Sequence, residues 1–272
     1  DVNLSTALLE WNFNNGTVTN FTMNSSNLTH FYYNMTNLNK ITYSYKVYGN
    51  DSVNNFGESN NITITVDNLP PSVVSINSPI NNENFSSGIE IFNVTVNDTY
   101  SNIDTVLFNI TNSSGQIILT ATNLIDDLNN DTWNYSLNLN YLVEEVHTLT
   151  IIANDTLGNI NNTESINFTV DRTSPQINLI TENDSTFNLT TPTFQFNFTE
   201  NIFNTANCVL YINDTAYAIN ESVLNFTNTN LTTNTSLANG NYFWNINCTD
   251  SSSNEGSSEI YSFSLSQDYS PP

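Results

Sequence analysis

Acidic residues recur shortly before three proline-containing segments of this 272-residue chain. The three are Asp67, Asp171 and Asp268, and three further Asp residues lie upstream of them at Asp51, Asp155 and Asp250. Carboxylate oxygens are the ligands that calcium prefers, so both sets are candidates for a metal site. The sequence shows no dense acidic cluster around them, and a lone Asp before a turn commonly caps backbone N–H groups. Capping is therefore the favoured interpretation, with calcium as the alternative.

The chain has two cysteines, Cys208 and Cys248. An even pair in an exported domain is typical of one disulfide, and two buried free thiols are the alternative. Cys248 takes the small inward position that Gly49 and Ala153 take in similar segments of the chain. Closing a loop of this length stabilises a domain by about 3 to 4 kcal/mol in the chain-entropy model. A Cys-x-x-Cys redox motif and a zinc-ligand pattern are both absent from the sequence.

Asparagine makes up roughly a fifth of the residues, and about 27 Asn-x-Ser/Thr triplets match the acceptor pattern for N-glycosylation. A strand that alternates Asn, an apolar residue and Thr produces such triplets without any glycan, as at Asn93 and Asn167, which are kept as further candidates. Alternation does not produce triplets at turns, so we expect N-linked glycans there first. The turn candidates are Asn15, Asn50, Asn154, Asn183 and Asn213.

Side chains that could perform catalysis are present, but their spacing is not typical of an active site. His30 and His147 have no motif partner, and no Gly-x-Ser-x-Gly, His-Glu-x-x-His or phosphate-binding loop occurs. Adjacent Glu144 and Glu145 point to opposite faces if they lie in a strand. The sequence therefore predicts no enzymatic activity.

The charge balance excludes one class of partner. There are 26 acidic residues against three Lys and Arg, and the formal net charge is -23 at pH 7, so nucleic acid is repelled. No run of 18 or more apolar residues occurs, so no membrane insertion is expected in this segment. Hydrophobic residues at 38% and aromatic residues at 12% are nevertheless enough to build folded cores.

The chain contains three similar segments, which together predict an all-β fold. Each has an alternating apolar strand that ends in Asp, a polar turn, a second alternating strand, and then Asp and Pro. Their spacing of about 100 residues is the size of a seven-stranded sandwich, and the proline joints are short and semi-rigid. We predict a partial domain over residues 1–68, complete domains over 69–171 and 172–268, and a linker over 269–272 that leads to a further repeat.

The first repeat is predicted to be incomplete at its N-terminus. The strand that starts at Ala7 matches the strand of the second repeat that starts at Val106, yet only six residues precede Ala7. About two strands are therefore missing. Their absence would leave Leu9, Trp11 and Phe13 exposed unless upstream chain or a neighbouring subunit covers them. Upstream chain is the favoured source.

This arrangement resembles the tandem Ig-like repeats of archaeal and bacterial cell-surface proteins. The clearest match is Ile151-Ile-Ala-Asn-Asp-Thr-Leu-Gly-Asn159, followed by a strand that ends at Asp171. The first and third repeats depart at the Gly-Asn step, which leaves their turn type open. The resemblance implies tandem β-sandwich domains of the fibronectin-III or bacterial Ig-like kind in an exported array, and it implies no chemistry.

The sequence therefore predicts an extracellular structural protein of the cell surface. The favoured role is a repeating segment of a glycosylated filament, sheath or S-layer-like assembly, and the alternative is the stalk of an adhesin. Expected partners are copies of the chain or adjacent repeats, with surface carbohydrate or another surface protein as alternatives. N-linked glycans are the one expected addition, and dense glycosylation favours an archaeal source.

Overall fold

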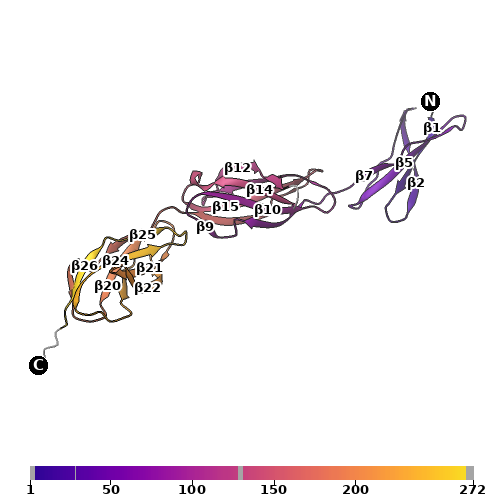
Figure 1. The fold of residues 1–272 in the computed structure, drawn as a ribbon. Coiled ribbons are helices and arrows are strands. Elements are labelled where there is room, and N and C mark those ends of the chain that lie inside the picture. The colour runs from indigo at the N-terminus through magenta and orange to yellow at the C-terminus, as the bar shows by residue number, and fades with distance from the viewer. Residues whose placement is uncertain (1–3, 28, 128–130, 268–272) are drawn as a thin grey trace.

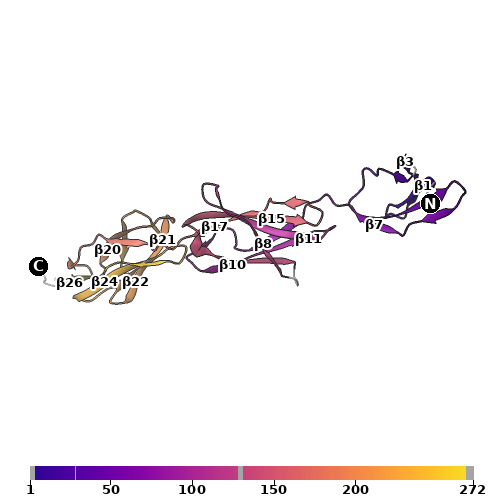
Figure 2. The ribbon, with the colours of Figure 1, turned by 90° about the horizontal axis from the view of Figure 1, so that it is seen from above.

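The computed structural model describes residues 4–27, 29–127 and 131–267. These residues form three β-sheet units that follow one another end to end, with the first and third units at opposite ends of the array (Figures 1 and 2). The regular structure of the described residues is almost entirely strand, the exception being one 3-10 turn over Leu139–Tyr141. No helix in this part of the chain is long and apolar enough to cross a membrane. The predicted all-β class is confirmed.

The second unit is a sandwich of two sheets. Their strand orders are β13-β14-β10-β8 and β12-β11-β15-β17-β9, with β16 paired to β15. The strands are β8 (Ser72–Ser78), β9 (Glu83–Phe85), β10 (Ile89–Asn97), β11 (Ile103–Thr111), β12 (Ile117–Asn123), β13 (Ile125–Asp127), β14 (Thr132–Asn138), β15 (Glu145–Asp155), β16 (Ile160–Asn161) and β17 (Ser165–Val170). Alternate side chains such as Phe92, Val94 and Val96 of β10 are buried between the sheets. This period-two burial explains why these segments form strands.

The third unit repeats this architecture. Its sheets have the orders β18-β20-β23 and β19-β26-β24-β21-β22, with β25 paired to β24. The strands are β18 (Gln176–Leu179), β19 (Ser185–Phe187), β20 (Thr193–Thr199), β21 (Thr205–Ile212), β22 (Thr215–Leu224), β23 (Thr229–Thr232), β24 (Gly240–Thr249), β25 (Glu255–Ser257) and β26 (Tyr261–Leu265). In both sandwiches a short strand joins the larger sheet in parallel to the last strand, as β9 with β17 and β19 with β26. The two units are therefore structural repeats.

The first unit corresponds to the larger sheet of the other two. It has the strand order β2-β1-β5-β6, with β7 also paired to β5, and a separate hairpin of β3 and β4. Its strands are β1 (Leu4–Asn12), β2 (Val18–Thr22), β3 (Asn24–Asn27), β4 (His30–Tyr32), β5 (Thr42–Asp51), β6 (Phe56–Glu58) and β7 (Ile62–Thr65). The register supports the correspondence, because Ala7 pairs with Gly49 on β1 and β5 as Val106 pairs with Ala153 on β11 and β15.

The inner face of the first sheet is covered in a way that the sequence analysis did not predict. Leu9 and Trp11 were expected to be exposed without further strands, but they are only 6% and 5% exposed. Side chains between Phe21 and Ile41 pack against them instead, because this segment folds back across the sheet. The buried cluster of this unit is small and consists of Leu9, Trp11 and Tyr43. That strands are missing from this repeat stays a prediction.

Candidate functional site at the domain joints

An Asp at or directly after the end of β5, β15 and β24 organises the turn that follows in each unit. In the third unit, Asp250 accepts hydrogen bonds at Oδ1 from the backbone N–H groups of Ser252 (2.8 Å) and Asn254 (2.9 Å). Its Oδ2 accepts a hydrogen bond from the side-chain amide of Asn254 at 2.9 Å. The same three bonds form in the other units, at Asp51 with Val53 and Asn55, and at Asp155 with Leu157 and Asn159. We call these segments the Asp turns.

The Asp turns have the same backbone geometry in all three units. The fourth residue is left-handed in each, with φ of 66° at Asn54, 87° at Gly158 and 65° at Ser253. This conformation favours Gly and tolerates Asn, so only the second repeat shows the Gly that a sequence comparison can recognise. The departure of the first and third repeats from the Gly-Asn step therefore changes the residue and leaves the turn unchanged.

The joint between the second and third units gathers three carboxylates. Asp171 follows β17 of the second unit, whereas Glu200 follows β20 and Asp250 follows β24 of the third. Each offers a carboxylate oxygen, and the three oxygens lie within 4.8 Å of one another. All three residues are buried, with Asp171 0% and Glu200 and Asp250 each 7% exposed. Carboxylates from both sides of a domain boundary therefore meet at one point.

The joint between the first and second units repeats this arrangement. Asp67 follows the last strand of the first unit, and it lies with Asp98 and Asp155 of the second unit, again with one oxygen from each within 4.8 Å of the others. Asp155 is buried, and the other two are partly buried. Of the calcium candidates in the sequence, Asp67 and Asp171 thus lie in acidic clusters, while Asp268 lies outside the described residues.

Asp98 and Glu200 were not predicted from the sequence. Both lie two residues beyond the last buried side chain of an alternating strand, Val96 in β10 and Phe198 in β20. Aligning these two strands by their alternation would have placed the two acids at one position. Their approach to a domain joint could not be read from the alignment, because it depends on how one unit is docked on the next.

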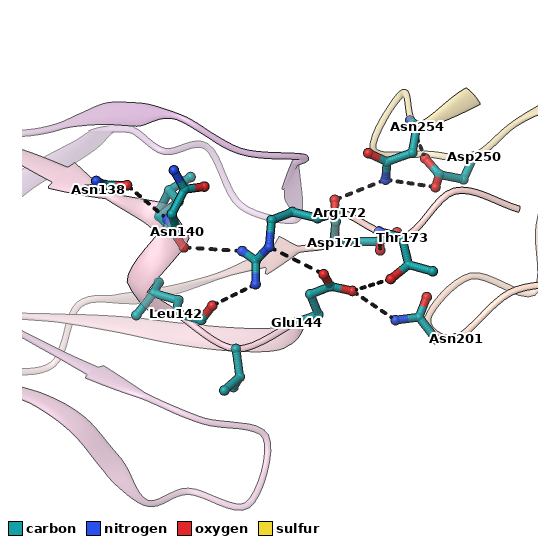
Figure 3. Close-up of polar contacts among 12 residues, drawn as sticks. Asn138, Asn140, Leu142, Glu144, Asp171, Arg172, Thr173, Asn201, Asp250 and Asn254 are labelled. Carbon is teal, nitrogen blue, oxygen red and sulfur yellow. Dashed lines mark hydrogen bonds and ion pairs between the residues drawn. The ribbon is translucent and has the colours of Figure 1, made fainter. Parts of the chain in front are cut away.

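A second set of contacts holds the joint between the second and third units, on the side facing the 3-10 turn (Figure 3). Arg172 approaches Glu144 at 3.3 Å from Nε to Oε1, and its guanidinium also donates to the backbone carbonyl of Leu142 at 3.0 Å. Glu144 Oε2 accepts hydrogen bonds from the Thr173 hydroxyl at 2.7 Å and from the Asn201 side chain at 3.1 Å. The hydrogen bond from Thr173 lowers the pKa of Glu144 despite its partial burial. Glu144 thereby connects the second unit to the linker and to the third unit.

The linkers also dock on the strand that follows each Asp turn. At the first joint, the side chain of Asn161 in β16 donates to the carbonyl of Pro71 at 2.7 Å. At the second joint, Gly256 in β25 lies directly against the linker, where a Cβ atom would come within 1.9 Å of the Pro175 carbonyl oxygen. The side-chain amides of Asn159 and Asn254 reach the carbonyls of Asp67 and Asp171 at 3.4 and 3.0 Å. Both linkers are therefore held by equivalent strands and turns.

The electrostatics of the second joint are unfavourable for three ionised carboxylates. The pKa of Asp171 is raised to about 6, mainly by burial; the hydrogen bond from Thr173 opposes the rise, and the charges of Asp250, Glu200 and Glu144 add to it. Burial also raises the pKa of Glu200. At the first joint, burial acts to raise the pKa of Asp155. Hydrogen bonds, led by those from Asn159, outweigh this effect, so the pKa of Asp155 is lowered.

These shifts predict a pH dependence for the protein stripped of divalent cations. An acid whose pKa is raised by folding binds its proton more tightly in the folded state, so its contribution to stability is present at low pH and lost as the pH rises through the folded pKa. We expect the unfolding temperature of the third unit to fall between pH 5 and pH 7, on either side of the value of about 6 for Asp171. Differential scanning calorimetry measures this fall. It should be smaller in Asp171→Asn, and an equal fall in that variant would contradict the assignment.

The two cysteines form a disulfide inside the third sandwich. Cys208 of β21 and Cys248 of β24 are directly opposite each other in the antiparallel register, with Cα atoms 4.1 Å apart. Both are 0% exposed. The pair occupies the position of Val106 and Ala153 in the second unit and of Ala7 and Gly49 in the first.

The glycosylation candidates differ in accessibility. Asn15, Asn183 and Asn213 are exposed at turns, whereas Asn50 and Asn154 are half-buried and each has a side-chain oxygen that is buried without a hydrogen-bond partner. In the strands, Asn93 takes part in a row of amides across the sheet, receiving a hydrogen bond from Asn77 and donating one to Asn134. The exposed Asn167 accepts from the Thr148 hydroxyl at 2.9 Å.

His147 and the adjacent glutamates are engaged in structural contacts. His147 is buried against Phe168, and its Nε2 lies 2.9 Å from the Val143 carbonyl oxygen. Glu144 belongs to the domain joint, and Glu145 bonds with Ser113 on the neighbouring loop. These residues are not brought together as an acid–base pair.

No known family model and no curated protein matches the sequence. Among solved structures, the chain is similar to the fibronectin(III)-like modules of Clostridium thermocellum CbhA, with 11% identity, 71% of this chain and 93% of that chain covered, and a TM-score of 0.40. It is also similar to the FN1–FN3 domains of chicken CNTN1, with 8% identity, coverage of 96% and 89%, and a TM-score of 0.36. A domain of intimin has 15% identity, coverage of 70% and 98%, and a TM-score of 0.33. These likenesses concern the β-sandwich fold alone.

Proposed function

We propose that this chain is an extracellular structural segment, a set of tandem Ig-like units in a glycosylated surface filament, sheath or S-layer-like assembly. The observation that carries the proposal is the end-to-end order of the units, with joints built from linker, Asp turn and adjacent strand in the same way at both boundaries (Figure 1). Such joints transmit position and force along a chain, and they need no catalytic group.

The alternative role is the stalk of an adhesin. A stalk needs only linkage along its length, whereas a lateral assembly buries about 1,000 Å² or more between neighbouring molecules. Exposed apolar side chains on the outer faces of the sandwiches favour lateral contact. Ile89 and Ile91 on β10, and Ile125 on β13, are each more than half exposed and lie in the same sheet of the second unit.

Electron microscopy of the native surface, with an antibody against the chain, distinguishes these roles. The assembly predicts a regular lattice or filament in which the label repeats at the spacing of the units. Isolated projections labelled along their length would identify a stalk. Label confined to the interior of the cell would contradict both.

Glycosylation is expected first at the exposed turn sequons. Attachment joins the glycan to Nδ2 of Asn, so an exposed side chain at a turn accepts it without loss of packing. We expect glycans at Asn15, Asn183 and Asn213 with higher occupancy than at Asn93, whose amide nitrogen already donates within the sheet. Glycopeptide mass spectrometry of native material measures these occupancies. Unmodified Asn at all three turn sites would contradict the proposal.

A further inference from the structure

The two acidic clusters at the domain joints are built from equivalent positions. Each cluster contains the Asp that follows the last strand of one unit. The other two acids come from the next unit: one is the residue after β10 or β20, and the other is the Asp of the Asp turn. The members are Asp67, Asp98 and Asp155 at the first joint, and Asp171, Glu200 and Asp250 at the second. An acidic cluster that formed by chance on a crowded anionic surface would not recur at the same three positions.

The second cluster contains carboxylate oxygens that lack partners although they are buried. One oxygen of Asp171 accepts from the Thr173 N–H at 3.0 Å, and one oxygen of Glu200 accepts from the Asn201 N–H at 2.6 Å. The other oxygen of each, Oδ2 of Asp171 and Oε2 of Glu200, is buried without a hydrogen-bond partner. Burying a carboxylate is energetically unfavourable unless a cation or a hydrogen-bond donor compensates its charge. These two oxygens therefore lack the partner that their burial requires.

No side chain in the described part of this joint supplies the compensating charge. Arg172 is next to Asp171 in sequence, but its guanidinium points toward Glu144 and the carbonyls of Leu139 and Leu142 (Figure 3). The ion pair and hydrogen bonds of this guanidinium are thus made with Glu144, Leu139 and Leu142, outside the cluster. At the first joint, Oδ2 of the partly buried Asp67 also lacks a hydrogen-bond partner.

We propose that each joint binds a divalent calcium ion, held by the three carboxylates and bridging the two units that supply them. Oxygen-only ligands favour calcium or magnesium over zinc, since neither cluster contains His or Cys. Calcium accepts irregular sets of oxygen ligands, whereas magnesium requires a near-ideal octahedron. Clusters whose carboxylates come from two separate units therefore suit calcium better than magnesium.

The consequence is a joint whose stiffness depends on calcium. The ion connects the end of one sandwich to a strand end and an Asp turn of the next, so bending the joint would require the ligands to separate. Without it, the mutual repulsion of three carboxylates opposes docking of the units. The proposal does not depend on whether the array forms a filament or a stalk.

The test uses the whole chain, freed of metal with EDTA, with isothermal titration calorimetry and thermal unfolding in calcium chloride. We expect two ions to bind per chain and the unfolding temperature to rise with calcium concentration, because a ligand that binds only the folded state stabilises it. An absence of both heat and thermal shift would overturn the proposal. A response to magnesium chloride that equals or exceeds the response to calcium would overturn the assignment of the ion.

Two variants separate binding from turn structure. Glu200→Gln keeps the oxygen that accepts from Asn201 and removes the charge, so we expect calcium to bind at least about tenfold more weakly at one of the two sites. In EDTA the same variant should unfold at a higher temperature than the wild type, because one of three repelling charges is gone. The control is Asp51→Asn, in an identical Asp turn that belongs to neither cluster. Equal calcium responses in both variants would indicate that Glu200 has a purely structural role. An unfolding temperature of Glu200→Gln in EDTA below that of the wild type would indicate the same.

Discussion

Replacing the disulfide by the pair Cys208→Val and Cys248→Ala is expected to lower the free energy of unfolding of the third unit by about 4 kcal/mol. The cysteines are 40 residues apart, so the bond closes a long loop in the unfolded chain and limits its conformational freedom. Val and Ala reproduce the Val106–Ala153 pair that the second unit has at this position, so the variant keeps a packed core. Urea denaturation of the whole chain measures the effect, and the second unit should unfold as before.

Reduction of the wild type supplies the control for that experiment. Unfolding in the presence of reductant should bring the third unit to the stability of the double variant, whereas reductant should leave the variant unchanged. A double variant as stable as the oxidised wild type would show that packing, rather than the covalent bond, stabilises this sandwich. Non-reducing peptide mapping, which should yield a Cys208–Cys248 peptide, tests the bond itself.

Much of the fold could be predicted because its sequence signal is local. The alternation of Phe92, Val94 and Val96, and of Phe194, Phe196 and Phe198, defines which face of each strand is buried, and these side chains form the cores of the two sandwiches. The match of Ala7 with Val106 was read from the same alternation, and the register of β1 and β11 agrees with it. Local patterning therefore sufficed for strands and their equivalence.

The candidate site could be predicted only in part, because it depends on contacts between units. Asp67 and Asp171 were recognised from their place before proline, but the acids that meet them come from strand ends and turns in the following unit. Likewise, the burial of Trp11 depends on a long segment that folds back across its sheet, and no periodic pattern specifies that path. Such docking is tertiary information that alternation and motifs do not contain.

Gly256→Ala is expected to disrupt the second joint, because the methyl group has no room. The new Cβ atom would lie 1.9 Å from the carbonyl oxygen and 3.0 Å from the carbonyl carbon of Pro175. These are backbone atoms, so relief requires the linker or β25 to move, at a cost of about 1 to 3 kcal/mol for an overpacked site. We expect a lower urea midpoint for the third unit and a wider distribution of interatomic distances in small-angle X-ray scattering of the chain.

Gly57→Ala is the matched control for this prediction. Gly57 pairs with Gly49 on β6 and β5 as Gly256 pairs with Cys248 on β25 and β24, so the two glycines occupy the same structural position. A Cβ atom at Gly57 would meet nothing within 4 Å, and the change should alter stability by no more than about 0.5 kcal/mol. The contrast isolates the linker contact from any general effect of Ala in a short edge strand. If both variants lost stability equally, Gly256 would be required by its strand, and the close docking of Pro175 would have no part in holding the joint.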